Sequence, residues 1–244
     1  MVNDLDPDAA RAVVDAIEGL GGRAVPAPGS VADPAVAAGL VTTCVRSFGR
    51  IDGLVNNAGI LVERPAWETT ADQSRAMVEV NVLGTIHVGH AAIDRMREQG
   101  GPASIVNVTS GTHLGQPGLA VYGATKGAVA SLTYGWALDL VGTEIRVNAV
   151  SPLAVTPMKL PPYDGHAMPE DIAAVVRYLL SEASAPMTGQ IVRRSRTELG
   201  LIRPPAIGTM LTGDWTVSAI AEAFADRLEL EPVGLGAHQV QVQA

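Results

Sequence analysis

Short β-branched segments alternate with longer helical segments along most of this chain, and this alternation constrains the fold more than any other feature. Runs such as 103–108 and 145–150 are short enough to be buried strands, and apolar residues recur at helical spacing on either side of them. Strands that are joined by helices run parallel, and the helices cover both faces of the sheet. The sequence therefore predicts an α/β fold with a three-layer, doubly wound parallel sheet.

The same patterns divide the chain into elements and regions. The expected helices are 7–20, 33–48, 71–99, 119–141, 169–181 and 216–228, and the expected strands are 51–56, 103–108, 145–150 and 190–193. Pro204-Pro205 and Gly208 interrupt the pattern near the end of the chain. We therefore expect one domain over residues 1–205 and a C-terminal extension over residues 206–244.

Composition and charge exclude several classes of protein. The 244 residues carry a formal net charge of −8, which argues against nucleic acid or an anionic membrane as the main partner. Cys44 is the only cysteine, so no disulfide framework or cysteine metal site is expected. The acidic start of the chain does not resemble a signal peptide, and no uninterrupted apolar run approaches the length of a membrane span. These features predict a soluble, cytoplasmic protein.

Tyr122-Gly123-Ala124-Thr125-Lys126 opens a predicted helix and carries the most informative pair of side chains. A spacing of four residues places Tyr122 and Lys126 on one helical face, within reach of each other. A free phenol has a pKa of about 10, and a neighbouring ammonium favours its deprotonated form. The pair is therefore suited to general acid/base chemistry if other polar groups gather around it.

Three further polar features could gather around this pair. Ser110 follows the predicted strand at 103–108, and Asn56-Asn57-Ala58-Gly59 ends the predicted strand at 51–56. Asn81 interrupts an apolar run inside a predicted helix, where asparagine is unfavourable unless its amide is used. Ligands of open α/β sheets bind outside the carboxyl ends of the strands. These residues therefore define a candidate active site at that edge of the sheet.

At this point the chain resembles the classical short-chain dehydrogenase/reductase family, over about residues 2 to 205. The matching motifs are, in order, Asn56-Asn57-Ala58-Gly59, Asn81, Ser110, Tyr122 with Lys126, and Asn148-Ala149-Val150-Ser151-Pro152 followed by Thr156. The resemblance implies a Rossmann-like fold and an oxidoreductase that interconverts a small-molecule secondary alcohol and a ketone with a nicotinamide cofactor. It also implies a homodimer or homotetramer assembled through the helices at 71–99 and 119–141.

The resemblance further implies a role for single residues. Tyr122 is the expected general acid/base, Lys126 lowers its pKa and binds the nicotinamide ribose, and Ser110 holds the reacting oxygen. Asn81 is expected to keep a water molecule in a proton relay. Thr109 has the family's usual spacing of 13 residues from the tyrosine, so it stays open as an alternative to Ser110. The expected cofactor contacts are Asp4, Asn57, Ala58, Gly59, Tyr122, Lys126, Pro152 and Thr156.

One part of the family pattern is missing from the sequence. Family members begin with a strand and a glycine-rich turn whose backbone amides bind the cofactor pyrophosphate. Asn3-Asp4 instead matches the end of the family's second strand, where an aspartate favours NAD over NADP. The sequence is then a shortened version of a complete enzyme, or the protein is a non-redox descendant (a lyase, isomerase or binding protein) that has lost the dinucleotide site. A third interpretation is an inactive subunit that supports a complete paralogue.

Other candidate residues carry weaker signals. His113 is either a substrate contact or a loop residue without a role, and no third ligand accompanies His87 and His90, so no metal site is expected. The short, proline-rich loop at 158–168 occupies the place of the family's substrate lid. Arg193-Arg194-x-Arg196 is either a solvated strand end or a phosphate site.

Overall fold

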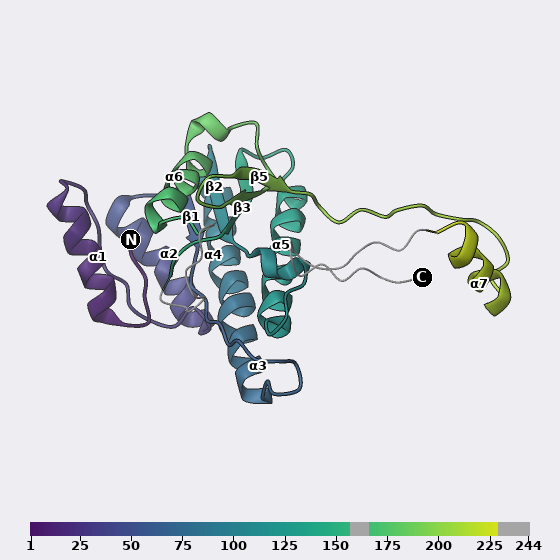
Figure 1. Ribbon diagram of the computed structural model, residues 1–244. Helices are drawn as coiled ribbons and strands as arrows, with labels where there is room; N and C mark the ends of the chain where they lie inside the picture. Colours follow the sequence, from purple (N-terminus) through teal and green to yellow (C-terminus); the bar gives the residue numbers. More distant parts are fainter. Residues whose placement is uncertain (157–165, 229–244) are drawn as a thin grey trace.

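Five strands form a single sheet in the computed structural model, which describes residues 1–156 and 166–228 (Figure 1). The strands lie side by side in the order of the sequence. Four of them run parallel, and the last returns antiparallel to its neighbour. Their bounds are β1 (Gly53–Asn56), β2 (Ala103–Val108), β3 (Ile145–Pro152), β4 (Ile191–Arg194) and β5 (Leu199–Ile202).

Helices cover both faces of this sheet, which confirms the predicted doubly wound architecture. Successive strand residues point to opposite faces. Ile105 and Val147 therefore pack under α2 (Pro34–Phe48), α4 (Gly84–Gln99) and α5 (Ala120–Asp139), whereas Val106 and Val150 pack under α6 (Pro169–Leu180). β2 and β3 are buried on both faces although they carry several polar residues. These polar groups are hydrogen-bonded inside the protein: the Ser104 hydroxyl donates to the Leu179 carbonyl oxygen, and Asn107 Nδ2 donates to the Thr133 hydroxyl.

The helices begin where the sequence places their capping residues. Asp6 accepts a hydrogen bond from the Asp8 amide at the start of α1 (Pro7–Gly19), and Asp33 accepts two from the first turn of α2. Each of these aspartates is followed by a proline, whose fixed φ suits the first helical position.

Two elements differ from the sequence-based expectation. The predicted helix at 71–99 is divided into α3 (Ala71–Val78), a π-helical turn (Glu79–Leu83) and α4. β5 was not expected, because its four residues include Gly200 and glycine weakens a strand pattern. By length and composition the stretch 71–99 could cross a membrane. In this fold its α4 part instead contributes the fully buried Ala92 and Met96 to the core.

The edge of β1 that faces away from β2 has no partner strand among the described residues. Val2 and Pro26 form one isolated parallel bridge, which is separate from the five-stranded sheet. Val55 and Gly53 are exposed, whereas β2 is almost entirely buried. Within the described part of the chain, β1 therefore presents an unpaired backbone edge.

The C-terminal region leaves the sheet after β5. An extended segment leads to α7 (Val217–Asp226), which lies well away from the sheet in Figure 1. This helix confirms the one expected at 216–228. Most of the lid-like loop and the weakly patterned end of the chain lie outside the described residues.

Candidate active site

The carboxyl end of β2 and the first turns of α5 bring Ser110 and Tyr122 together. After Ser110 the chain forms a short 3₁₀ turn (Gly111–Leu114) that packs against α5. A Cβ atom at Gly123 would lie 2.6 Å from the Thr112 carbonyl oxygen, so only glycine permits this close approach. The turn, whose Thr112 amide donates a 3.3 Å hydrogen bond to the Ser110 hydroxyl, thus returns the chain so that the Ser110 side chain lies near enough to Tyr122 to influence its pKa.

The structure distinguishes Ser110 from Thr109, the alternative with the usual spacing. Thr109 is buried, and its hydroxyl donates a 2.7 Å hydrogen bond to the Lys126 carbonyl oxygen. Ser110 is half-buried and faces the phenol instead. Adjacent residues of an extended chain point in opposite directions, so only one of the two hydroxyls can face Tyr122.

Lys126 is held in the interior beneath Tyr122. Its side chain is 4% exposed, its Nζ donates a 2.8 Å hydrogen bond to the Val108 carbonyl oxygen, and Nζ lies 5.7 Å from the centroid of the Tyr122 ring. Burial lowers the pKa of the Lys126 ammonium to about 8, because its charged form has lost most of its hydration.

The pKa of Tyr122 differs in direction from the sequence-based expectation. Burial raises the pKa of Tyr122 above its ordinary value, and the nearby Ser110 side chain acts in the opposite direction without cancelling the increase. The physical reason is the same as for Lys126: a buried phenolate loses hydration, and no contact among the described residues compensates fully. Proximity of the ammonium in sequence was therefore insufficient to predict a lowered pKa.

Asn81 lies in the π-helical turn and connects three parts of the site. It is fully buried; its Oδ1 accepts a 2.8 Å hydrogen bond from the Ile60 amide, and its Nδ2 donates to the Ile60 carbonyl oxygen at 2.9 Å. The same Nδ2 donates to the Thr125 hydroxyl at 3.0 Å. Asn81 therefore fixes the loop that follows β1 against α5, which is the use of the amide that its helical position suggested.

The expected cofactor contacts fall into two groups. Asn57 and Ala58 are exposed and Gly59 is half-buried just beyond β1, and Pro152 ends β3 at the same edge of the sheet. A Cβ atom at Gly59 would lie 3.2 Å from Asn81 Oδ1 and 3.6 Å from Lys126 Nζ, so the loop approaches these side chains closely. Thr156 is exposed four residues after Pro152.

Asp4 lies apart from this group. It is exposed, and its Oδ1 accepts a 3.0 Å hydrogen bond from the Asp6 amide in the N-terminal segment outside the sheet. The part of the site around Tyr122 and Lys126 fits a ribose and a nicotinamide, since it offers a hydroxyl pair and a buried ammonium. Within the described residues, no glycine-rich turn leads from a strand into a helix at this edge, so a cradle for the pyrophosphate is missing.

Two contacts in the site were not anticipated from the sequence. Thr125 donates a 2.7 Å hydrogen bond to the Tyr122 carbonyl oxygen while accepting one from Asn81. His113 forms a short ring-nitrogen contact with the Ser110 carbonyl oxygen. Thr125 could have been suspected from its position inside the Tyr122/Lys126 motif, but neither partner is indicated by spacing alone.

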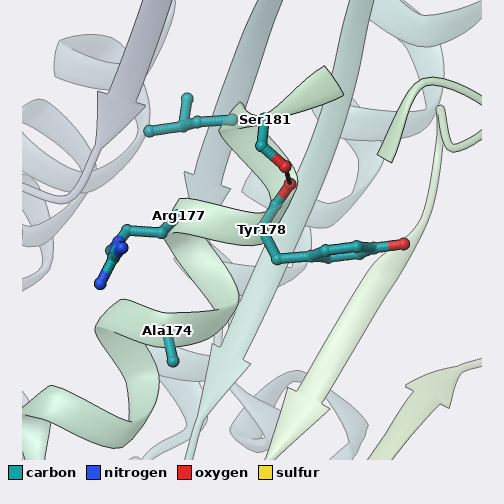
Figure 2. A pocket seen from close by; sticks show the side chains of 5 residues that line it. Ala174, Arg177, Tyr178 and Ser181 are labelled. Atoms are coloured by element: carbon teal, nitrogen blue, oxygen red, sulfur yellow. Dashed lines mark hydrogen bonds between the residues drawn. The ribbon is translucent and has the colours of Figure 1, made fainter. Parts of the chain in front are cut away.

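A shallow hollow of about 560 Å³ lies elsewhere, along α6 (Figure 2). Figure 2 shows that the Arg177 and Tyr178 side chains extend in different directions from α6, and that the Ser181 hydroxyl donates to the Tyr178 carbonyl oxygen. None of the lining residues is a candidate site residue, so the hollow is not the candidate active site. The lining residues are Ala174, Arg177, Tyr178, Leu180 and Ser181.

Comparisons with known proteins give consistent results. A family model described as short chain dehydrogenase matches residues 1–161. An uncharacterized oxidoreductase of Methylorubrum extorquens is 35% identical over 76% of this chain and 81% of its own length. The 3-oxoacyl-[acyl-carrier-protein] reductase FabG of Thermotoga maritima is 34% identical over 79% of this chain and 84% of its own length.

Solved structures of short-chain and other dehydrogenases are also similar to this chain. A crystal structure of a short chain dehydrogenase from Mycobacterium avium has a TM-score of 0.84 and 30% identity, covering 92% of this chain and 83% of that chain. A gluconate 5-dehydrogenase from Burkholderia cenocepacia, solved in complex with NADP and tartrate, has a TM-score of 0.73 and 27% identity, covering 79% and 82%.

Proposed function

This chain belongs to the short-chain dehydrogenase/reductase family of oxidoreductases, and on that premise we propose that it interconverts a small-molecule secondary alcohol and a ketone. The observation that carries the proposal is the gathering of Ser110, Tyr122 and the buried Lys126 at the carboxyl edge of the sheet, where Lys126 Nζ lies 5.7 Å from the centroid of the Tyr122 ring. Relatives named as dehydrogenases and reductases support a redox reaction over the non-redox alternative.

The chain's own residues account for the proton in this reaction. In the direction of alcohol oxidation, the deprotonated Tyr122 oxygen accepts the hydroxyl proton of the substrate. Ser110 donates a hydrogen bond to the substrate oxygen that loses this proton. Lys126 favours the deprotonated phenol while it is charged. A bound nicotinamide ring supplies the hydride acceptor or donor. Asn81 acts as a positioning residue, because it fixes the loop at Gly59 beside Lys126.

We propose NAD rather than NADP as the cofactor. Asp4 is exposed at the end of the N-terminal extended segment, and a carboxylate there accepts hydrogen bonds from ribose hydroxyls but repels a 2′-phosphate. The expected contacts with nicotinamide and ribose are Asn57, Ala58, Gly59, Tyr122, Lys126, Pro152 and Thr156. We also place the protein in the cytoplasm, in agreement with the free thiol of Cys44.

The assignment of Tyr122 is tested by Tyr122→Phe, assayed with NAD at millimolar concentration and a panel of secondary alcohols. We expect turnover to be abolished with the fold unchanged by circular dichroism, because only the hydroxyl is removed. Tyr134→Phe is the matched control, since Tyr134 lies farther along α5 and its buried hydroxyl has no partner among the described residues. Wild-type activity in Tyr122→Phe would contradict the assignment.

Cofactor binding gives a second test of the site. Pyrophosphate recognition in this type of fold comes from backbone amides of a glycine-rich turn and the helix behind it. Losing three charge-assisted hydrogen bonds, at about 1.5–3 kcal/mol each, weakens binding by roughly three to six orders of magnitude. We therefore expect calorimetry to give this 244-residue chain a millimolar or weaker dissociation constant for NAD. Adding a strand and a glycine-rich turn before Met1 should restore tight binding, and tight binding by the unaltered chain would refute the argument.

A further inference from the structure

We propose that the arginine rim, defined as Arg194 and Arg196, binds a carboxylate or phosphate group of the substrate. The rim lies at the carboxyl end of β4 and in the turn that follows. This inference rests on the proposed function, because it specifies the class of substrate: a secondary alcohol or ketone that carries an anionic group remote from the reacting carbon.

Charge is distributed unevenly along this chain. The whole protein has a net charge of −8, yet residues 193–203 contain four arginines and a single acid, Glu198. Among the described residues, neither Arg194 nor Arg196 forms an ion pair with an acidic side chain. The Arg194 Nη1 donates instead to the Glu198 main-chain oxygen at 3.3 Å, and the Glu198 carboxylate accepts from the Ser195 hydroxyl at 3.2 Å. The positive charge of the rim is therefore not neutralised by a direct contact.

The β4–β5 hairpin gives the rim a defined position. Arg194 pairs with Leu199 across the hairpin, and the Ser195 amide donates a 3.0 Å hydrogen bond to the Glu198 carbonyl oxygen. This bond closes a four-residue turn that contains Arg196. Binding groups held on a hairpin lose less freedom on binding a ligand than groups on an unstructured tail.

The order of the strands relates the rim to the reacting groups. The residues at the carboxyl edge follow the strand order: Asn57–Gly59 lie beyond β1, Ser110 beyond β2, Pro152 at β3 and Arg194 at β4. Among the proposed cofactor contacts, Asn57–Gly59 thus lie on the opposite side of Ser110 from the arginine rim, whereas Pro152 lies between Ser110 and the rim. A substrate whose oxygen lies at Ser110 can extend away from β1, over β3 and towards β4.

The distance between Ser110 and the arginine rim sets the length of this substrate. Pro152 and Arg194 are register partners, and the Thr109 amide donates to the Val150 carbonyl oxygen, so these strand ends are aligned. Two inter-strand spacings separate β2 from β4 by about 10 Å. Arginine binds carboxylate and phosphate oxygens through paired N–H donors. The geometry favours an anionic group several bonds away from the carbon that reacts.

The test compares binding of 8-oxononanoate, a methyl ketone that ends in a carboxylate, with binding of its methyl ester. Calorimetry is performed on the full chain and on the double variant Arg194→Gln/Arg196→Gln. We expect the double variant to bind the carboxylate about tenfold more weakly and the ester within about twofold of the wild type. Arg11→Gln/Arg177→Gln removes the same charge from exposed positions on α1 and α6, and it should leave both affinities unchanged. An octyl phosphate probe with the same variants distinguishes a phosphate preference from a carboxylate preference.

The outcomes separate this inference from the proposed reaction. Three results would overturn the inference. The wild type could bind the acid and the ester equally, or it could bind neither the carboxylate nor the phosphate. The double variant could also lose the same affinity for the acid as for the ester. Tyr122→Phe should keep the preference for the acid while losing turnover. If the wild type prefers the acid but never reduces the ketone, the proposed reaction fails and the arginine rim stands.

Discussion

Replacing Lys126 with methionine should remove one pH-dependent contribution to the free energy of unfolding. Lys126 is almost fully buried, and burial lowers its pKa from 10.5 to about 8. The unfolded chain restores the ordinary value. Between these two values the unfolded state carries a proton that the folded state has released. The free energy of unfolding of the wild type should therefore rise as the pH rises through this window.

The magnitude follows from the two pKa values. The difference between 10.5 and about 8 corresponds to about 3 kcal/mol of destabilisation, which is fully present below pH 8 and absent above pH 10.5. From about pH 7 to about pH 9.5, the linkage relation gives a recovery of about 2 kcal/mol. Tyr122 titrates above the range from about pH 7 to about pH 9.5, because its ordinary pKa is 10.0 and burial raises it further.

The assay is urea unfolding of the wild type and Lys126→Met at several pH values from about 7 to 9.5, at constant ionic strength. Other titrating groups are common to both proteins, so the difference between the two free energies isolates Lys126. We expect that difference to change by about 2 kcal/mol in favour of the wild type as the pH rises. A difference that stays constant within about 0.5 kcal/mol would show that the Lys126 ammonium is hydrated in the folded protein and would refute the reasoning.

Two further predictions concern the loop after β1 and the quaternary structure. Asn81→Ala leaves the Ile60 amide and carbonyl without their partners, so we expect a loss of about 2–4 kcal/mol in urea unfolding together with reduced turnover; unchanged stability would show that the loop is held by other contacts. The α4 and α5 helices should pair with those of a second copy, since Leu138 near the end of α5 and Val141 just after it are largely exposed. Light scattering at micromolar concentration should give a dimer or tetramer, and a monomer would contradict this.

Several features of this protein could be predicted from the sequence because they depend on neighbours along the chain. Asp6 and Asp33, each followed by a proline, predict the starts of α1 and α2, since a cap requires only a short side chain and the next few amides. The alternation of short β-branched segments with helical segments predicts a parallel sheet that is covered on both faces. The family motifs likewise predict which residues meet at the carboxyl edge, because parallel strands all end there.

Other features depend on atoms that are distant in the sequence. The family's usual spacing favoured Thr109, and it is the packing of the Gly111–Leu114 turn against Gly123 that directs the Ser110 hydroxyl towards Tyr122. The hydrogen bonds of Asn81 join segments that are 21 and 44 residues apart. No local pattern could specify these partners.

The pKa of Tyr122 and the β4–β5 hairpin likewise depend on how separate segments of the chain pack together. The sequence places a cation four residues from the phenol, but the pKa depends on how far packing removes the phenol from water, and here desolvation dominates. β5 contains a central glycine and forms because β4 offers it an unpaired edge. Local periodicity determines which residues enter the interior, whereas hydrogen-bond partners and desolvation arise only when separate segments pack together.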